Sequence, residues 1–211
     1  MIKFPPDDFW PIFKSTNGAL SCAEAIALYN IVSDCEQGDF IELGSHKGKS
    51  SLAIALAMPK VSRLILVEPE FEDRDWAQEV LSKISTHTGN VPVGYGSYSL
   101  DILPIYNVLS FCFVDSGNHS DDLVMTETKM LEDKIIKGGI IAYHDKGSQF
   151  IKVNEAYDYL LATGKYEEIK IEWEPIFDYV KEHDLETGNL SWHLYPDLSH
   201  PPNFVGALKR K

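Results

Sequence analysis

Basic residues are in short supply in this sequence, which has 19 Lys and Arg against 32 Asp and Glu and a formal net charge of −13. A negative field of this size repels phosphate backbones and anionic lipid head groups. We therefore expect neither nucleic acid nor a membrane surface to be a primary partner. The three basic residues at 209–211 are interpreted as a solvated tail.

Cysteine is also scarce, and its arrangement excludes the common cysteine chemistries. Cys22, Cys35 and Cys112 cannot all pair, and none stands in the C-x-x-C spacing of a zinc or redox centre. A reducing compartment fits this usage best. Cys112 lies within an apolar run, so we expect it to be a small buried hydrophobic residue rather than a nucleophile.

Long hydrophobic stretches are missing as well. No run reaches the roughly 18 apolar residues that a membrane span requires. The first residues, MIKFPPDDFWPIF, carry prolines and acids where a signal peptide needs a continuous apolar core. These absences predict a protein of the cytoplasm. With 211 residues, 44% of them hydrophobic, the chain is long enough to bury the core of a single domain over 1–211.

The chain alternates short apolar runs with amphipathic stretches. Ser21 and Glu24 form the pattern of a capping box at the start of a first helix, with Leu20 placed as its hydrophobic staple. Strands are then expected at 40–43, 64–67, 91–95, 110–114 and 139–143, and helices at 50–58, 75–84, 123–136 and 154–161. Apolar strands without polar alternation are typical of a parallel sheet covered on both faces.

Two further strands are expected near the C-terminus, at 166–173 and 204–208, as an antiparallel pair at the edge of the sheet. Residues 1–19 form an N-terminal lead, and 184–202 is predicted to be a loop or lid because it is rich in Gly, Asn, Pro and His. The predicted fold is therefore α/β: a Rossmann-like, doubly wound, mostly parallel seven-stranded sheet with helices on both faces and an antiparallel C-terminal edge.

Acidic, other polar or turn-forming residues stand at the carboxyl end of each predicted parallel strand, where open α/β sheets bind ligands. In strand order these residues are Glu42 and Gly44, Glu68 and Pro69, Gly96 and Ser97, Asp115, and His144 and Asp145. Several carboxylates at one edge oppose a triphosphate but suit a ribose diol, a sulfonium cation or a divalent metal. The pattern thus favours a ligand with one of these three features over a nucleoside triphosphate.

The glycine turn at 44–50 has two competing interpretations. It is similar to a phosphate-binding P-loop, but three residues stand between Gly44 and Gly48 where a P-loop needs four. A nicotinamide-binding turn would carry the pattern G-x-G-x-x-G, which is absent, although Glu68 lies at a suitable distance to meet a ribose. A nucleotide-binding or NAD-dependent enzyme stays open as a less favoured alternative.

Four segments together resemble the class I S-adenosylmethionine-dependent methyltransferases, and within them the small-molecule O-methyltransferase-like branch. That branch has an E-x-G-x-x-x-G-x-S turn and an H-D pair after the fifth strand. The resemblance covers about residues 20–145. The segments that carry it are ELGSHKGKS at 42–50, VEP at 67–69, FVDSGNHS at 113–120 and GGIIAYHD at 138–145.

The resemblance implies a cofactor site for S-adenosylmethionine. In it, the turn from Gly44 to Ser50, including Ser45, His46 and Gly48, would wrap the methionine part, with the amides near Ser50 meeting its carboxylate. Glu42 would lie near the amino group, Glu68 would bind the ribose hydroxyls, Gly96 and Ser97 would lie against the adenine, and Asp115 would face the sulfonium. His46 stands where the commoner turn has a third glycine.

The reaction implied is methyl transfer to a hydroxyl of a small-molecule acceptor, with His119 or His144 as the base and Asp115 and Asp145 beside them. His144 is alternatively an orienting partner of Asp115. Related enzymes hold magnesium at positions matching Asp115 and Asp145, so a metal is a further expectation. An inactive cofactor-binding relative remains an alternative, and a homodimer would fit a chain of this size.

Overall fold

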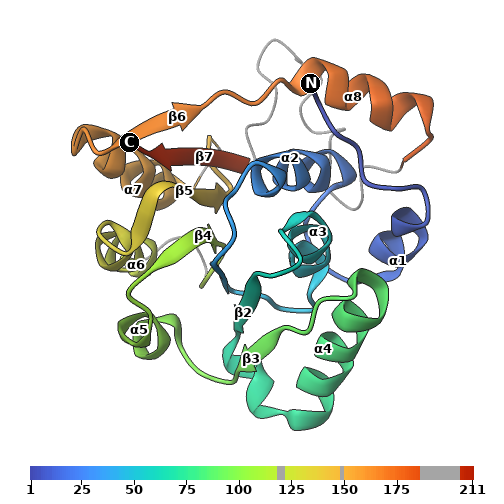
Figure 1. Cartoon of the computed structure of the whole chain (residues 1–211), viewed down its shortest axis with the longest axis horizontal. Helices are drawn as coiled ribbons and strands as arrows, with labels where there is room; N and C mark the ends of the chain where they lie inside the picture. The colour runs from blue at the N-terminus through green and yellow to red at the C-terminus, as the bar shows by residue number, and fades with distance from the viewer. Residues whose placement is uncertain (118–121, 148–149, 186–204) are drawn as a thin grey trace.

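One seven-stranded sheet runs through the part of the chain that the computed structural model describes, residues 1–117, 122–147, 150–185 and 205–211 (Figure 1). Its order is β3-β2-β1-β4-β5-β7-β6. The pairs among β1 to β5 are parallel, whereas β7 runs antiparallel to both β5 and β6. The strands are β1 (Asp39–Leu43), β2 (Arg63–Val67), β3 (Val93–Tyr95), β4 (Leu109–Val114), β5 (Ile135–His144), β6 (Tyr166–Ile169) and β7 (Val205–Arg210).

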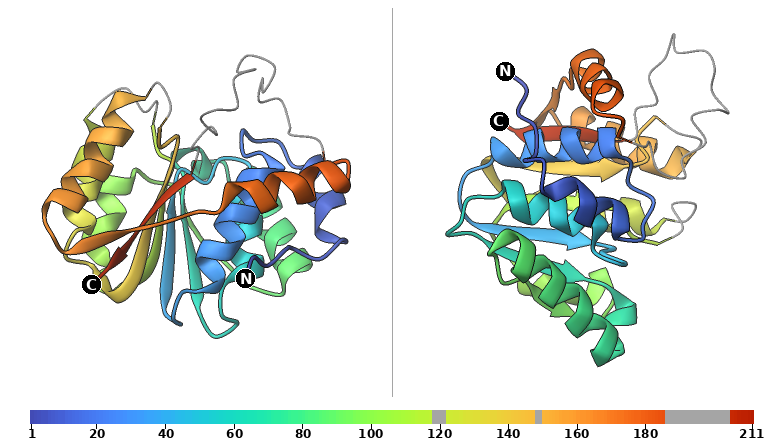
Figure 2. Two further views of the ribbon diagram at one scale, coloured as in Figure 1. Left: turned by 90° about the horizontal axis from the view of Figure 1, so that it is seen from above. Right: turned by 90° about the vertical axis from the view of Figure 1, so that its right-hand side faces the viewer.

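Helices cover both faces of this sheet, as Figures 1 and 2 show. One face carries α1 (Phe9–Ser15), α2 (Cys22–Ser33), α3 (Lys49–Ala57), α4 (Arg74–Thr88) and α8 (Trp173–Glu182). The other carries α5 (Ser99–Ile102), α6 (Leu123–Leu131) and α7 (Ile151–Ala162), and the short 3-10 helices η1 (Pro69–Glu72) and η2 (Leu103–Ile105) lie in the loops after β2 and α5. The predicted doubly wound, mostly parallel fold is confirmed.

Strand residues alternate between two hydrophobic cores. Phe111 and Phe113 of β4 pack with the helices on the side of α2 and α3, and Cys112 and Val114 pack on the side of α6 and α7. Every residue of β4 is buried, which is expected of a central parallel strand covered on both faces. Cys112 is fully buried, as predicted, and burial raises the pKa of its thiol well above the ordinary value.

The start of α2 confirms the predicted capping box. The Ser21 side chain accepts a hydrogen bond from the Glu24 amide, and the Ser21 amide donates to Glu24 Oε2 at 2.7 Å. Leu20 is buried beside it. The box places the Glu24 carboxylate, which is fully buried, close to the carboxyl edge of the sheet.

The helix predicted over 123–136 is wrong at its end. It stops at Leu131, and β5 begins at Ile135 and runs for ten residues, rather than starting at Gly139. Ile135 and Ile136 are β-branched and pack better on a pleated sheet than in a final helical turn. The register between β4 and β5 shifts at this point, between Leu109 and Phe111.

The chain beyond α7 differs from the prediction in a second place. The strand expected over 166–173 ends at Ile169, and Trp173 begins α8, in which Trp173, Ile176 and Val180 are buried. Pro175 argued against a helix at the sequence level, but a proline in the first turn of a helix displaces no intrahelical hydrogen bond. The antiparallel pairing of β6 with β7 is confirmed.

The two ends of the chain are more ordered than predicted. The N-terminal lead contains α1, whose Phe9, Trp10 and Phe13 are buried. The basic C-terminal residues are not a free tail, because β7 extends through Arg210 and its guanidinium donates to the carbonyl of Ile135. The predicted lid at 184–202 lies outside the described residues beyond Leu185. No helix in the described part of the chain is long and apolar enough to cross a membrane.

Glu42 is a fully buried acid on β1, beneath the start of α3. The hydroxyls of Ser50 and Ser51 donate to its two carboxylate oxygens. Burial raises the pKa of Glu42 to about 7, and the charges of Asp115 and Glu68 add to this effect while the serine hydrogen bonds oppose it. The packing of α3 on β1 therefore depends on the protonation of one carboxyl group.

We predict that Glu42→Gln stabilises the protein at high pH relative to the wild type. When folding raises the pKa of an acid, its contribution to the free energy of unfolding is complete at a pH below the pKa of the unfolded chain, here near 4.5. This contribution is lost as the pH rises through the pKa of the folded protein, here about 7. Between pH 5.5 and pH 8 the free energy of unfolding of the variant should therefore rise relative to the wild type by about 2 kcal/mol. Urea unfolding at the two pH values measures this change.

Glu36→Gln is the matched control, because Glu36 is exposed and surface substitutions change stability by no more than about 0.5 kcal/mol. An equal difference between Glu42→Gln and the wild type at both pH values would contradict the assignment of a raised pKa.

Candidate active site

The glycine turn between β1 and α3 passes directly over the end of β4. Gly44 has φ 88°, and a Cβ at this position would lie 2.2 Å from the carbonyl oxygen of Asp115. Gly48, with φ 79°, is the left-handed residue that begins α3. Only glycine combines these torsions with so close a backbone approach, so the turn forms the floor of any ligand site at this edge.

His46 also adopts a left-handed conformation, with φ 40°, which explains why glycine is common at this position. Its amide donates to Glu68 Oε2 at 2.7 Å, so the carboxylate after β2 holds the turn after β1. The exposed imidazole lies edge-on to Trp76, with the ring centroids 6.1 Å apart. His46 therefore replaces glycine at the cost of a strained backbone that Glu68 stabilises.

A cavity of about 500 Å³ opens beside this turn at the carboxyl edge of the sheet. Its walls come from four parts of the chain: the N-terminal turn before α2, the glycine turn, the ends of β2 and β3, and the end of β4. The residues that line it include Asn17, Gly18, Leu20, Gly44, Ser45, His46, Lys49, Ser50, Glu68, Tyr98, Ser99, Asp115 and Ser116.

Two polar groups in the cavity wall have unused binding capacity. The Ser45 hydroxyl is buried and has no hydrogen-bond partner among the described residues. The Lys49 ammonium lies 3.5 Å from the Gly18 carbonyl and over the Phe13 ring, and it makes no ion pair with a described residue. Partial burial lowers the pKa of Lys49. A hydroxyl and a cation in this position suit an anionic ligand group.

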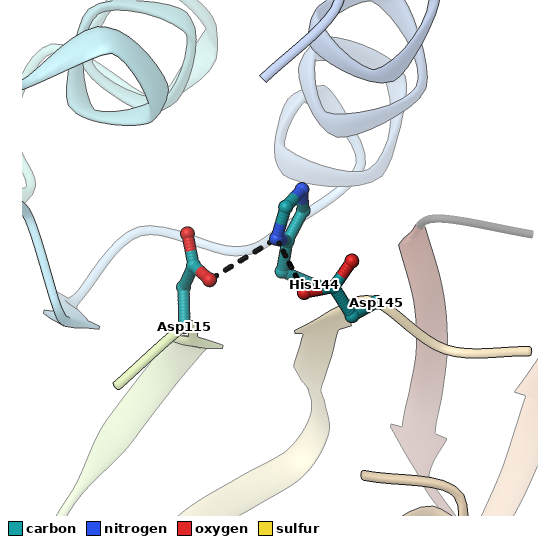
Figure 3. A group of neighbouring side chains, drawn as sticks. All are labelled: Asp115, His144 and Asp145. Carbon is teal, nitrogen blue, oxygen red and sulfur yellow. Dashed lines mark ion pairs between the residues drawn. The ribbon is translucent and has the colours of Figure 1, made fainter. Parts of the chain in front are cut away.

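Behind the cavity, the imidazole of His144 joins three acids, and Figure 3 shows two of them, Asp115 and Asp145. His144 Nδ1 lies 3.1 Å from Asp115 and 3.4 Å from Asp145, and Nε2 lies 3.1 Å from Glu24. Burial alone would lower the pKa of His144, but the charge of Asp115 and the hydrogen bonds that the ring donates to Asp115, Asp145 and Glu24 together raise it well above its ordinary value. The group is an imidazolium enclosed by carboxylates.

The structure thus brings together Asp115, His144 and Asp145, as predicted from the strand ends. Their ligand atoms lie within 4.8 Å of one another, a spacing compatible with a metal ion. Asp145 has φ 60°, an uncommon conformation that turns the chain away after β5. His119, the other candidate base, lies outside the described residues.

Other predicted site residues lie around the cavity without lining it. Glu42 is buried beneath the turn and Gly48 is buried within it. Gly96 lies where a Cβ would be 2.6 Å from the Glu72 amide. The Ser97 hydroxyl points to Asp101, at 3.4 Å. Tyr98 and Ser99, the next two residues, line the cavity instead.

Sequence reasoning missed three contributors to the site: the N-terminal turn at 17–20, the pair Tyr98 and Ser99, and Glu24. The capping box located Glu24 on α2, but only the packing of α2 against the ends of β4 and β5 brings it to His144. A periodic pattern carries no signal for such contacts, because they join residues that are 120 positions apart.

Comparison with known proteins agrees with this geometry. A family model described as a methyltransferase domain matches residues 41–146, which is half of the chain. The matched segment contains the glycine turn, Glu68, Asp115 and the His144–Asp145 pair. A search of curated protein sequences found no match.

Solved structures share the fold at low sequence identity. An O-methyltransferase from Bacillus cereus, in complex with S-adenosylhomocysteine (SAH), has a TM-score of 0.61 and 13% identity over 78% of this chain and 84% of that one. The O-methyltransferase TomG from Streptomyces achromogenes, in complex with S-adenosylmethionine, has a TM-score of 0.60 and 18% identity over 80% and 84%. A putative O-methyltransferase from Klebsiella pneumoniae has a TM-score of 0.57 and 13% identity over 80% and 84%.

The predicted family is therefore confirmed, and the turn is neither a P-loop nor a dinucleotide-binding fingerprint. The chain belongs to the methyltransferase domain family and is a methyltransferase with the fold of the class I S-adenosylmethionine-dependent enzymes.

Proposed function

We propose that this methyltransferase transfers the methyl group of S-adenosylmethionine to a hydroxyl group of a small molecule. The observation that carries the proposal is the cavity of about 500 Å³, in which the glycine turn lies between the carboxylates of Glu68 and Asp115. These groups suit a ligand with a diol and a cationic centre. The fold neighbours in complex with SAH and S-adenosylmethionine support the choice of cofactor.

The anionic end of the cofactor would lie against the start of α3. The amides near Ser50, the free Ser45 hydroxyl and the Lys49 ammonium all face this part of the cavity. Together with the helix dipole they favour a carboxylate. The carboxylate of the methionine tail would thus give the Ser45 hydroxyl a hydrogen-bond partner and the Lys49 ammonium an ion-pair partner, neither of which the described residues supply.

Glu68 would bind the ribose. Its two oxygens accept the amides of His46 and Glu70, at 2.7 and 3.2 Å. An ionised carboxylate has about four acceptor sites, so Glu68 retains capacity for two ribose hydroxyls while it holds the turn. The same side chain thus shapes the site and contacts the cofactor.

The chemical step is an in-line displacement. The bond from sulfur to the methyl carbon breaks as the bond from the acceptor oxygen to that carbon forms, the sulfonium becomes the thioether of SAH, and the hydroxyl proton leaves to a base. The protein mainly aligns the three atoms and excludes water. We assign Asp115, at the cavity wall, as the carboxylate that contacts both the sulfonium and the acceptor hydroxyl.

His144 is better suited to orienting Asp115 than to acting as the base. Both of its ring nitrogens face carboxylates, and its raised pKa keeps it protonated. A protonated imidazole donates hydrogen bonds and takes no proton. His144 therefore fixes the position of Asp115 and neutralises part of the acidic charge beside the reaction site.

The same arrangement does not fit a magnesium centre. His144 Nδ1 lies within 3.1 Å of Asp115 and 3.4 Å of Asp145, so the imidazole already bridges the two acids that a magnesium ion would have to bridge. Magnesium prefers six oxygen ligands and disfavours imidazole. We therefore assign no step to a metal, and the imidazolium supplies the positive charge instead.

The acceptor is proposed to be a small metabolite with a hydroxyl group, such as a sugar or a polyketide-like compound. A cavity of about 500 Å³ suits a small molecule beside the cofactor, and the net charge of −13 opposes polyanionic acceptors. Assembly as a homodimer and residence in the cytoplasm remain predictions.

We predict that SAH binds with a micromolar dissociation constant in titration calorimetry, and that ATP and NAD do not bind. Glu68→Gln should weaken SAH binding by about 10- to 100-fold, because one charged hydrogen-bond acceptor is lost. Glu72→Gln is the matched control, since Glu72 is an exposed acid on the same short helix that does not line the cavity. Binding of ATP with no response to SAH would refute the proposed cofactor.

We predict that Asp115→Asn lowers the rate of methyl transfer by at least about 100-fold, measured with a hydroxyl acceptor found by screening. Asp133→Asn changes an acid at the opposite edge of the sheet, where Asp133 pairs with Lys165, and should leave the rate unchanged. Full activity of Asp115→Asn would show that the reacting groups lie elsewhere.

We predict that magnesium has no effect on this enzyme. Calorimetric titration with MgCl₂ should release no binding heat, and neither MgCl₂ nor EDTA should change the SAH affinity or the methyl-transfer rate. Manganese serves as a second probe, because its electron paramagnetic resonance signal broadens on binding. A manganese signal that the wild type broadens and Asp145→Asn does not would establish a metal site and overturn this assignment.

A further inference from the structure

Glu127 is a buried acid that none of the steps above uses. It lies on α6 with no exposed surface. The Ser99 hydroxyl donates to its Oε1, and the Ser116 hydroxyl lies 2.6 and 2.5 Å from its two oxygens. A buried carboxylate is costly unless hydrogen-bonded, and the two serines are among the groups that stabilise it.

Both serines also line the cavity. Ser99 is the first residue of α5, which follows β3, and Ser116 lies in the loop after β4, so Glu127 is reached from two different strand ends. One carboxylate thus holds two walls of the site in place. Since both serines are almost fully buried, their hydroxyls have few alternative partners.

The hydrogen bond to Glu127 limits what Ser99 can do toward the cavity. A serine hydroxyl has one hydrogen and two lone pairs. When that hydrogen is donated to Glu127, only lone pairs remain for a ligand, and Ser99 can accept but not donate. It will then favour a ligand group that carries a hydrogen and disfavour a carbonyl oxygen.

The base of the cofactor is the ligand group at this position, if the proposed function is correct. Glu68, after β2, is assigned to the ribose, and β3 is the next strand outward in the sheet. The segment after β3, where Tyr98 and Ser99 form part of the cavity wall at the start of α5, would therefore lie beyond the ribose. Adenine presents an exocyclic amino group, a donor, whereas hypoxanthine presents a carbonyl in its place.

We propose that Glu127 is a positioning residue that makes Ser99 an obligate hydrogen-bond acceptor and so selects a cofactor with an amino-bearing purine. The inference rests on the proposed function and deepens it. Glu127 does not touch the cofactor; it acts through the hydroxyl of Ser99.

The test compares SAH with S-inosylhomocysteine, whose base carries a carbonyl at C6 in place of the amino group and, with it, a hydrogen on N1 in place of a lone pair. Titration calorimetry should show that the wild type binds SAH at least about tenfold more tightly, the cost of one mismatched buried hydrogen bond. In Glu127→Gln the amide can donate to Ser99 and release its hydroxyl hydrogen toward the base. The preference for SAH should then fall by about tenfold.

The ratio of the two dissociation constants is the readout, because a partly unfolded variant weakens both ligands equally. Ser99→Ala is the second variant, and it should weaken SAH while leaving S-inosylhomocysteine almost unchanged. Glu132→Gln is the matched control: Glu132, at the end of the same helix, accepts the Tyr159 hydroxyl at 2.7 Å but lies outside the cavity. It should keep the ratio of the wild type.

An unchanged ratio in both Glu127→Gln and Ser99→Ala would overturn the inference, as would a wild type that binds the two compounds equally. These outcomes differ from a failure of the proposed function, in which the wild type does not bind SAH at all. A variant that loses affinity for both compounds by the same factor shows a purely structural role for Glu127 and likewise counts against the inference.

Discussion

The whole site depends on the position of β1 beside β4 in the sheet. The strand order reverses here: β2 and β3 lie on one side of β1, and β4 and β5 on the other. The loops after β1 and β4 turn toward opposite faces, and a crevice opens between them. Gly44 is the contact point, because its missing side chain lets the turn after β1 lie against the backbone of Asp115. Without that approach the cavity would have no floor.

Acidic residues gather around this crevice, and each is stabilised in a different way. Ser50 and Ser51 donate hydrogen bonds to Glu42, whose pKa is raised by burial. Ser99 and Ser116 are among the donors to Glu127, and backbone amides donate to Glu68. Glu24, Asp115 and Asp145 share the imidazolium of His144. Such arrangements are needed because a carboxylate in a low-dielectric environment is costly without donors or a counter-charge.

His144 connects the fold with the chemistry. Its ring joins α2, β4 and β5, so the position of Asp115 depends on the packing of the helix that begins with the capping box at Ser21. A fixed cation at this point would compensate part of the negative charge of the acids that we propose to face the sulfonium. The site is thereby preorganised by the protein's own side chains.

Much of this protein could be predicted from its sequence alone. The runs that form β1, β2 and β4 are short, apolar and without polar alternation, and they are buried almost throughout. The parallel sheet and the acids at its strand ends could therefore be predicted from local sequence information. The prediction failed where local information was ambiguous, at Ile135 and at Pro175. The contact between Ser99 and Glu127 could not be predicted from the sequence, because nothing in their spacing of 28 residues indicates that they meet.

The glycine turn, the alternation of strands and helices along the chain and the acids at the strand ends could be read from the sequence, because these features depend on torsion preferences and on local hydrophobic patterning. The order of the strands in the sheet and the environment of each acid came from the tertiary structure. Burial, and the donors that other elements bring within reach, turned Glu42 into a structural acid, Glu68 into a support for the turn and His144 into an imidazolium, since the pKa and the partners of a group depend on everything packed around it.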